Sequence, residues 1–390
     1  MRIKHKPSDF MVEEQIIFPG DEGLYAYYKV EKNDAATTEV RDDMAAKLKV
    51  TPSALVFPAL KDAAALTIQY ASVRKKGPAK IKGPNYTAER VQWGPRALRP
   101  RDLEKNCFKI IVRDMEAPDV EKLSAILPRI AQYGIPNYFD DQRFGSLTQD
   151  GFIGKEILKR DAERVVHMYL AEPMIGDPQY IREFKKLVES HWGQWGFLLH
   201  QAPRPSNFRS VITYLKDHPH EYRKATNLIQ DRLLSIYLSA YQSWVWNLIV
   251  AEFLVRKAST PYNIDIVGRL FPVLEPGEET ASFVNLLVDR PRLTANYQGE
   301  FASVAEAVFK DEELEIRDFK ARILRRVYLS KGERPIWYIP ADLEIADVTD
   351  DDDFENRQMT TVSFTLDSGQ YATLILKTAA GLSGTPIQVR

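Results

Sequence analysis

The dipeptide Lys61-Asp62 is the first feature of this 390-residue sequence that could carry chemistry. It lies where a short apolar run ends, and Ala63-Ala64-Ala65 follows it. Three alanines leave space around the Asp62 carboxylate. An aspartate in an ordinary turn is the alternative, and the dipeptide alone favours that alternative.

A second candidate is the segment Asn137 to Gly145, which follows a predicted helix stop at Gly134-Ile135-Pro136. It places aromatic rings, an amide, the Arg143 guanidinium and a glycine within nine residues. A plain connector does not need such side chains, whereas a segment that holds a nucleic-acid strand or braces a site does. The alternative is that the arginine and tyrosine tie two domains together.

Hydrophobic periodicity predicts the elements that position these residues. Residues from about 147 to 330 are mostly helical in pattern, and strands are expected on both sides of them. This order favours one α+β domain that is interrupted by an insertion. The predicted strands are 10–12, 24–30, 66–73, 107–112 and 362–366, and the predicted helices begin at Thr37 or Thr38, cover 120–130, and begin again near Tyr371.

The composition is that of an ordinary globular protein, with 44% hydrophobic and 27% charged residues and a net charge of −1. It excludes disordered, collagen-like and coiled-coil classes. The single cysteine, Cys107, excludes an internal disulfide framework, so a reducing compartment, the cytoplasm, is expected. No signal peptide is visible after Met1. The apolar stretch Leu233 to Val255 contains Gln242, Asn247 and Glu252, which predicts a buried helix and no membrane span.

Charge is unevenly distributed along the chain. Residues 74–109 hold 11 Lys or Arg and 3 Asp or Glu, a net charge of +8, together with Tyr86 and Trp93. Three Gly-Pro pairs predict an irregular, exposed backbone there, suited to phosphate contacts and base stacking. The opposite extreme is the acidic run Asp350 to Asp353, which is expected to be a solvated face.

Several signatures of cofactor and metal chemistry are absent from the sequence. It has no GxGxxG, P-loop, HExxH or CxxC motif. His218-Pro219-His220 has a spacing seen in metal sites, but no partner lies nearby in the sequence. A two-metal nuclease site at the acidic run stays a weak alternative, because four adjacent aspartates cannot all face one metal pair. No metal and no cofactor are expected.

Five segments, taken in order, resemble the TruD-type transfer-RNA pseudouridine synthases. The segment Gly134 to Gly145 is similar to that family's most specific signature, Gly-x-Pro-Asn-Tyr-Phe-x-x-Gln-Arg-Phe-Gly. The other four are Lys6 to Glu14, similar to Pro-x-Asp-Phe-x-Val-x-Glu; Phe57 to Gln69, similar to the catalytic segment; Asn106-Cys107-Phe108, similar to Asn-x-Phe; and Phe364 to Ala372, similar to the closing segment.

The resemblance implies a fold and a domain division. The fold is α+β, with a pseudouridine-synthase-type catalytic domain built on a largely antiparallel sheet, and a mainly helical insertion domain. The implied domains are a discontinuous catalytic domain of residues 1–146 and 331–390 and an insertion domain of residues 147–330.

The resemblance also implies an activity, the isomerisation of a uridine in RNA, with uridine 13 in the D-arm of transfer RNA as the family's usual substrate. Asp62 would be the nucleophile, and Lys4 the cation that keeps it ionised. The implied substrate-binding residues are Phe10, Asn106, Phe108, Tyr371 and Arg143, and the implied partner is RNA, most simply transfer RNA. A monomer without membrane association is expected.

Two other classes stay open. A non-catalytic RNA-binding protein could keep the same RNA-binding surface. An Asp-dependent nucleosidase or other hydrolase would release uracil instead of retaining it.

Overall fold

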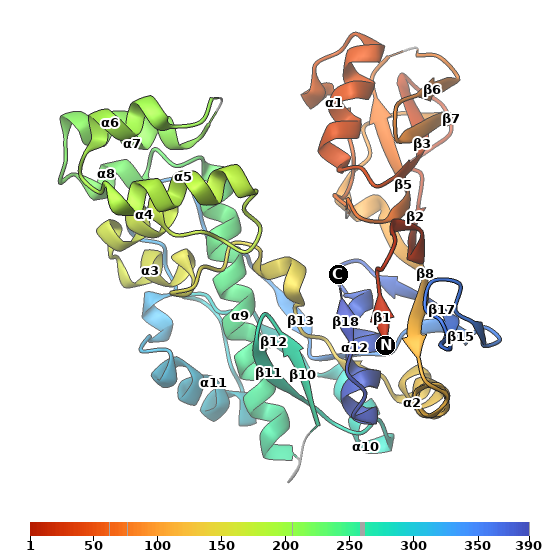
Figure 1. Ribbon diagram of the computed structural model, residues 1–390. Helices are drawn as coiled ribbons and strands as arrows, with labels where there is room; N and C mark the ends of the chain where they lie inside the picture. Colours follow the sequence, from red (N-terminus) through yellow and green to blue (C-terminus); the bar gives the residue numbers. More distant parts are fainter. Residues whose placement is uncertain (62, 76, 205, 258–261, 390) are drawn as a thin grey trace.

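The computed structural model describes residues 1–61, 63–75, 77–204, 206–257 and 262–389. Two masses of secondary structure rise side by side, one built on a long sheet and one mainly helical (Figure 1). The two chain ends lie together near the base of the sheet, where β1 (Arg2–Ile3) pairs in parallel with β18 (Gln388–Val389). The first and last described residues therefore belong to one structural unit.

The sheet has twelve strands, and its main path runs in the order β15-β17-β8-β2-β5-β3-β7-β6. All neighbours on this path are antiparallel except β2 and β5. The strands of the main path are β2 (Phe10–Ile16), β3 (Tyr25–Asn33), β5 (Leu66–Val73), β6 (Lys80–Lys82), β7 (Tyr86–Gly94), β8 (Leu103–Met115), β15 (Ala341–Ile345) and β17 (Gln358–Asp367). The short strands β4 (Leu55–Val56) and β16 (Thr349–Asp350) pair with β5 and β17.

Separate hydrophobic cores cover the two ends of the sheet. At the upper end in Figure 1, α1 (Thr37–Leu48) buries Val40, Met44 and Leu48 against β3, β5 and β7. These residues recur every four positions and form one helix face, as the sequence predicted. At the lower end α2 (Ala117–Tyr133) and α12 (Ala372–Ser383) pack on each other as part of the larger core.

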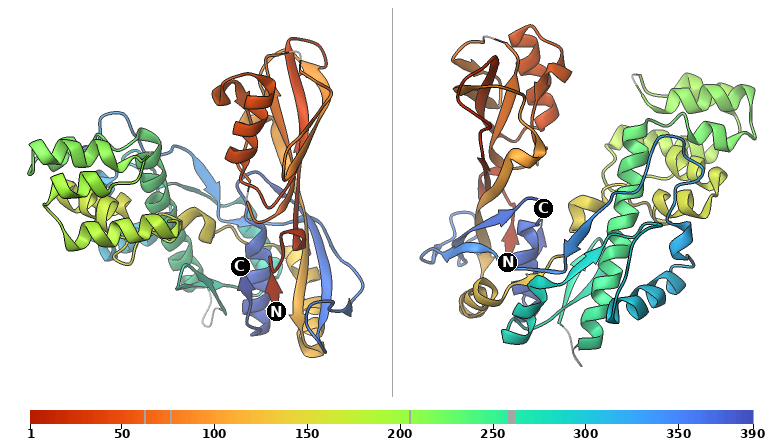
Figure 2. Two further views of the ribbon diagram at one scale, coloured as in Figure 1. Left: turned by 45° about the horizontal axis from the view of Figure 1, so that its top comes forward. Right: turned by 180° about the vertical axis from the view of Figure 1, so that it is seen from behind.

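The helical mass surrounds the 27-residue helix α9 (Asp231–Lys257), whose central part is buried almost all round (Figure 2). Its other helices are α3 (Ile153–Lys159), α4 (Ala162–Ala171), α5 (Gln179–Ser190), α6 (Trp195–Gln201), α7 (Phe208–Asp217), α8 (Tyr222–Thr226) and α11 (Glu300–Asp311). The short helix α10 (Glu278–Ala281) lies beside α2 instead (Figure 1). It also contains the hairpin β10 (Tyr262–Ile266) and β11 (Arg269–Val273).

Several connections join the two masses. The hairpin β10–β11 packs against α12, and Asn247 of α9 exchanges two 2.8 Å hydrogen bonds with the backbone of Phe139. Two further strand pairs lie in this region: β9 (Ile135–Pro136) with β14 (Trp337–Tyr338), and β12 (Leu287–Asp289) with β13 (Glu333–Pro335). One hydrophobic cluster includes residues from both predicted domains. The division at residues 146/147 and 330/331 stays a prediction.

Most predicted elements are confirmed, and the α+β fold class is correct. Two local predictions were wrong. Leu24, which was assigned to a strand face, precedes β3 and is 62% exposed. The basic segment 74–109 is mainly strand, in β6, β7 and the first part of β8, because its Gly-Pro pairs flank strands instead of breaking up the segment.

No helix among the described residues has the length and apolar character that crossing a bilayer requires.

Candidate active site

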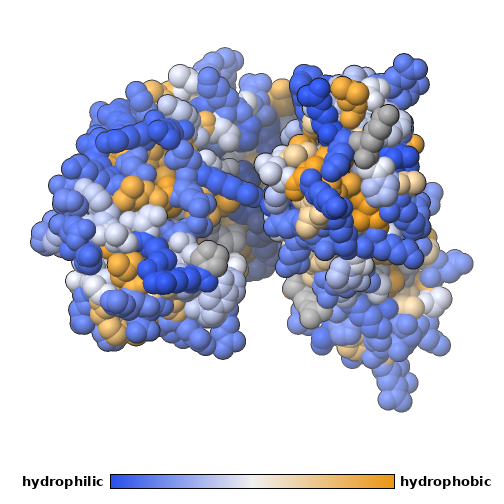
Figure 3. All heavy atoms as spheres, turned by 90° about the horizontal axis from the view of Figure 1, so that it is seen from above, coloured by the Kyte–Doolittle hydropathy of each residue, from blue (hydrophilic) through white to orange (hydrophobic). Residues whose placement is uncertain are grey.

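A pocket of about 250 Å³ lies where the N-terminal segment, the sheet and the loop before α12 meet. Viewed from above, the molecular surface is hollowed between the two masses (Figure 3). The pocket residues come from chain segments that are far apart in sequence: Lys4, Phe10, Val12, Ala59, Leu60, Lys61, Leu103, Asn106, Phe108, Gln142 and residues 368–373. Five of the predicted site residues, Lys4, Phe10, Asn106, Phe108 and Tyr371, are among them.

Two neighbouring strands supply the aromatic wall of the pocket. Phe10 begins β2 and Phe108 lies in β8, with their ring centroids 6.0 Å apart in an edge-on arrangement. Phe108 also stacks on Phe364 of β17 at 5.6 Å. Phe10 is buried, but Phe108 is only partly buried, so part of its ring can face a ligand.

Lys4 lies above this wall. Its Nζ is 4.1 Å from the centroid of the Phe10 ring, a cation–π distance. Its backbone has a φ of 59°, in the left-handed region that non-glycine residues rarely adopt. A turn of this kind between β1 and β2 sets the position of the Lys4 side chain over the pocket.

A polar cluster adjoins the aromatic wall. Glu14 of β2 and Asn106 of β8 are direct cross-strand partners, two or four residues beyond the phenylalanines on the same faces. Lys61 Nζ donates a short hydrogen bond to Asn106 Oδ1 and lies 3.3 Å from Glu14 Oε1. The parallel pairing of β2 with β5 brings the Lys61 segment to this point.

The Glu14 side chain is fully buried, and its Oε2 accepts a 2.9 Å hydrogen bond from the Tyr70 amide. Burial raises the pKa of the Glu14 carboxyl, and the positive charge of Lys61 opposes that rise. Glu14 and Lys61 were not predicted as site residues. The sequence did contain features that could have identified them: Glu14 is the glutamate of the opening motif, and Lys61 directly precedes Asp62.

The predicted nucleophile, Asp62, lies outside the described residues. Its chain neighbour Lys61 lines the pocket.

Tyr371 closes the pocket at the start of α12. Its backbone carbonyl accepts a 3.0 Å hydrogen bond from the Tyr338 hydroxyl, and its ring meets Phe139 edge-on at 6.2 Å. Burial raises the pKa of the Tyr371 phenol, while Arg143 and Arg334 oppose that rise.

Arg143, in the short helix η4 (Asp141–Phe144), is the one described member of the predicted set that does not line the pocket. Its Nε donates to Ser243 Oγ at 3.0 Å, and another guanidinium nitrogen donates to Ser239 Oγ, both on α9. Its neighbour Gln142 lines the pocket instead. These contacts favour the alternative for Arg143, in which it ties the signature segment to another part of the chain, here the helix α9.

The two aspartates of the signature segment, Asp140 and Asp141, bind side chains of α12. Lys377 Nζ lies 2.6 Å from Asp140 Oδ1 and 2.7 Å from Asp141 Oδ2, and Thr373 donates a hydrogen bond to Asp140. Burial lowers the pKa of the Lys377 amine, but the two carboxylates outweigh this and hold the pKa above its ordinary value. Lys377 therefore neutralises one of the two negative charges, and neutral donors, the Thr373 hydroxyl and the Val267 amide, bind the same two carboxylates.

Arg334 is a half-buried cation that the sequence did not reveal. It donates to Asn137 O at 3.0 Å, to Asn137 Oδ1 at 2.6 Å and to Gly369 O at 2.9 Å, and it lies 4.2 Å from the Phe139 ring centroid. No described carboxylate forms an ion pair with it. Burial lowers the pKa of its guanidinium, and the charges of Arg290 and Arg143 act in the same direction.

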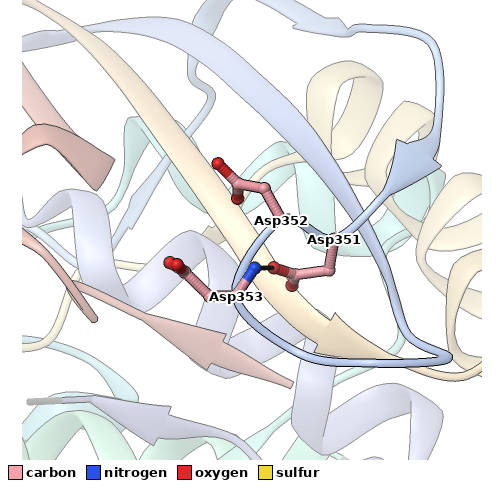
Figure 4. Close-up of side chains that lie close together, drawn as sticks. All are labelled: Asp351, Asp352 and Asp353. Carbon is pink, nitrogen blue, oxygen red and sulfur yellow. Dashed lines mark hydrogen bonds between the residues drawn. The ribbon is translucent and has the colours of Figure 1, made fainter.

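The acidic run is a structural clamp, so the prediction of a solvated face was wrong for Asp351, whose side chain is buried, whereas Asp350, Asp352 and Asp353 are exposed. Figure 4 shows Asp351, Asp352 and Asp353 in the turn after β16. Arg113, buried in β8, forms ion pairs with all three and with Asp9, which lies just before Phe10. Their carboxylate oxygens lie within 4.8 Å of one another, but this arrangement is explained by the shared guanidinium.

Comparison with known proteins supports the resemblance to the TruD-type pseudouridine synthases. The family model for tRNA pseudouridine synthase D (TruD) matches residues 1–271. A Methanocaldococcus jannaschii protein described as probable tRNA pseudouridine synthase D 2 is 32% identical, over 97% of this chain and 91% of its own length. The tRNA pseudouridine synthase D of Aquifex aeolicus is 26% identical over 97% of both chains. A Methanosarcina mazei structure assigned as tRNA pseudouridine synthase D has the same fold, with a TM-score of 0.69, 21% identity and coverage of 96% of this chain and 92% of its own.

Fold, pocket and relatives together define an enzyme of the pseudouridine synthase class. Within that class, the chain belongs to the tRNA pseudouridine synthase D (TruD) family.

Proposed function

We propose that this protein converts uridine 13 in the D-arm of transfer RNA to pseudouridine, with Asp62 as the nucleophile. The observation that carries the proposal is the pocket next to Lys61, which gathers a cation, two aromatic rings and an amide. Its volume of about 250 Å³ is near the lower limit of ordinary ligand pockets, a suitable size for one extruded nucleoside.

Three of the described pocket residues, Phe108, Asn106 and Lys4, have a distinct task in this reaction. The uracil, once flipped out of its stack, lies against the partly exposed ring of Phe108, which returns part of the unstacking energy. Asn106 is held by Lys61 and presents its amide NH₂ to the pocket as a donor. Lys4 supplies a positive charge that favours the ionised form of the Asp62 carboxylate.

The chemistry is an isomerisation in which no atom is gained or lost. The N1–C1′ bond breaks with the help of the Asp62 carboxylate, the uracil turns within the pocket, and C5 bonds to C1′. The proton leaves C5, and N1 gains one. The pocket walls must keep the detached uracil in place, and the packed rings of Phe10, Phe108 and Phe364 form the rigid side of this enclosure.

Three finer proposals accompany the reaction. Transfer RNA is the substrate because the relatives described above carry that activity in their names. The protein acts in the cytoplasm, where transfer RNA is found, and it acts as a monomer because the described pocket is assembled from one chain.

Asp62→Asn tests the assignment of the nucleophile. The amide keeps the size of the side chain but removes the charge and the nucleophile, so turnover should fall by more than about 10³-fold while transfer RNA is still bound. The assay is carbodiimide-block primer extension on transfer RNA from a strain that lacks the modification. Pseudouridine formed at the wild-type rate by Asp62→Asn would falsify the assignment.

The matched control is Asp141→Asn, because Asp141 is a second aspartate near the site whose side chain is 44% exposed. It should stay active. Asp140→Asn is a poorer control, since that carboxylate is buried against Lys377. Wild-type protein that binds transfer RNA without modifying it would favour a non-catalytic binding protein, and release of free uracil would favour a nucleosidase.

A further inference from the structure

Residues 320–331, between α11 and β13, form a second basic segment that we call the basic strap. It contains five Lys or Arg residues and no Asp or Glu. All five cations are exposed, namely Lys320, Arg322, Arg325, Arg326 and Lys331. The strap has no helix or strand, and it runs along α9 toward β13 (Figure 2, right).

Two side-chain amides fix the strap to the helical mass despite its irregular backbone. Asn227 donates to Ile323 O at 2.8 Å and accepts from the Arg325 amide at 3.1 Å. The buried Gln242 of α9 donates to Ser330 O at 2.9 Å and accepts from the Ser330 amide at 3.2 Å. These contacts satisfy strap backbone groups that lack a regular partner. The strap is therefore held at both ends.

Between these attachment points the side chains separate into two sets. Ile323 and Val327 are buried, and they anchor the strap in the hydrophobic core. Tyr328 is 80% exposed, which leaves its ring free on the surface. Among the described residues, no carboxylate forms an ion pair with any of the five cations. Like charges without counter-charges repel one another, and an anion bound across them would relieve that repulsion.

The row of cations continues to the active-site pocket. A guanidinium nitrogen of Arg290 donates to Lys331 O, and burial lowers the pKa of this guanidinium. Arg334 follows in β13 and donates to Gly369 O, whose residue lines the pocket. Positive charge without a paired carboxylate thus runs from the strap to the pocket wall.

The basic segment 74–109 differs from the strap, because several of its cations already have partners. Lys80 pairs with Glu89, Arg96 forms two 2.7 Å hydrogen bonds with Asp102, and Lys75 donates to Leu48 O at 2.5 Å. Net charge along the sequence therefore overstates what this segment offers to an RNA. In the strap, Arg322 donates to Arg317 O at 3.4 Å, but no described carboxylate neutralises any of the five cations.

We propose that the basic strap binds the phosphate backbone of the substrate RNA outside the pocket, with Tyr328 stacking on an unpaired base. This inference rests on the proposed function, since it takes the pocket as the place where the target nucleotide enters. Cations that neutralise phosphates and an exposed ring that stacks a base are the two elements of single-strand recognition.

The test measures binding of an unmodified transfer RNA transcript at several salt concentrations. Arg325→Gln/Arg326→Gln should weaken binding about tenfold and lower the salt dependence, log K against log salt, by roughly 1.5 for two lost phosphate contacts. Tyr328→Ala should weaken binding about 5- to 100-fold, while Tyr328→Phe, which keeps the ring, should bind like the wild type.

Two controls separate the strap from general charge. Lys122→Gln/Lys310→Gln removes two exposed cations of α2 and α11 and should leave the affinity nearly unchanged. Arg325→Lys/Arg326→Lys keeps the charge and should keep the salt slope. If the strap variant retains the wild-type affinity and slope, or loses no more than the α2/α11 control, the inference is overturned. Binding is measured without turnover, so a wild-type protein that forms no pseudouridine would contradict the proposed function and leave this result standing.

Discussion

Lys61 is the pocket residue that binds both a buried carboxylate and a pocket amide. Its ammonium group lies between the buried Glu14 carboxylate and the Asn106 amide oxygen, and its side chain is only 13% exposed. One charge therefore serves two purposes, since it balances a buried anion and fixes the orientation of a pocket donor. The next residue in the chain is Asp62, the predicted nucleophile.

Lys61→Met is expected to destabilise the protein by about 3–5 kcal/mol at pH 7, because it leaves the Glu14 charge buried without its cation. The pKa of Glu14 is already raised by burial, and loss of Lys61 raises it further. A carboxyl whose folded-state pKa is raised contributes stability below its unfolded pKa of roughly 4.3, and that contribution is lost as the pH rises through the folded-state value. The cost should therefore grow between about pH 4 and neutrality, as measured by urea denaturation across that range.

The double variant Lys61→Met/Glu14→Gln distinguishes stability from function. It removes both charges, so most of the lost stability at pH 7 should return. Activity should not return, because Asn106 still lacks its partner. A double variant with wild-type turnover would show that Lys61 serves only to neutralise Glu14.

At the scale of elements, the N-terminal segment that carries Lys4 and Phe10 is held by a clamp on β8. Arg113 connects Asp9 to the turn after β16, and Lys6 adds an ion pair with Asp353 at 2.5 Å. Arg113 is 4% exposed. The acidic run thus holds the N-terminal segment, which forms one wall of the pocket, against β8.

Arg113→Met should cost about 3–5 kcal/mol, because the buried Asp9 and Asp351 carboxylates lose their cation. The Asp351 partner variant has a distinct pH signature. Burial raises the pKa of Asp351, but hydrogen bonds from the Asp114 and Asp353 amides and from Arg113 outweigh it and lower the pKa. A carboxylate with a lowered pKa contributes stability above its unfolded pKa of roughly 3.9, and that contribution is lost as the pH falls through the folded-state value.

Asp351→Asn should therefore destabilise the protein more at pH 7 than at pH 3, in denaturant titrations at the two values. Asp350→Asn is the control, since Asp350 is exposed and its carboxylate pairs with no described residue. An equal effect of Asp351→Asn at both pH values would contradict the clamp.

Helices and strands could be predicted from the sequence where the local hydrophobic pattern determines them. The pocket residues Phe10 and Phe108 were named from the family resemblance, and the sequence pattern placed both on predicted strands, which the structure confirms. The contact of Lys61 with Glu14 was not found, because it depends on the parallel pairing of β2 and β5. Arg334 had no local signal, since its partners Asn137 and Gly369 are far from it in the chain. The pairing of basic residues with acids across β6 and β7 also depends on register, which charge counting ignores.

At the scale of the whole molecule, both ends of the chain support the pocket. Residues of β18 pair with Arg2 and Ile3, directly before Lys4. The left-handed turn at Lys4 thus follows a strand that is fixed by the far end of the sequence.

Removal of residues 388–390 should lower kcat more than it raises KM, because it frees the segment that carries Lys4 while the aromatic wall on β2 and β8 remains. Removal of residue 390 alone is the control and should leave kcat unchanged. Steady-state kinetics on transfer RNA measures both, and an unchanged kcat in the longer deletion would show that β18 does not position Lys4.

The arrangement of the sheet has a consequence for synthesis of the protein on the ribosome. β8 pairs with β2 near the start of the chain and with β17 near its end, and more than two hundred residues separate β8 from β17. Contacts between such distant segments form slowly and late. A nascent chain can fold the lobe around α1 and much of the helical mass while β8 still has one bare edge, since domains fold as units during translation. Until β17 and α12 emerge, the pocket lacks Tyr371 and the support of Phe364, so an incomplete chain should be unable to hold a uridine.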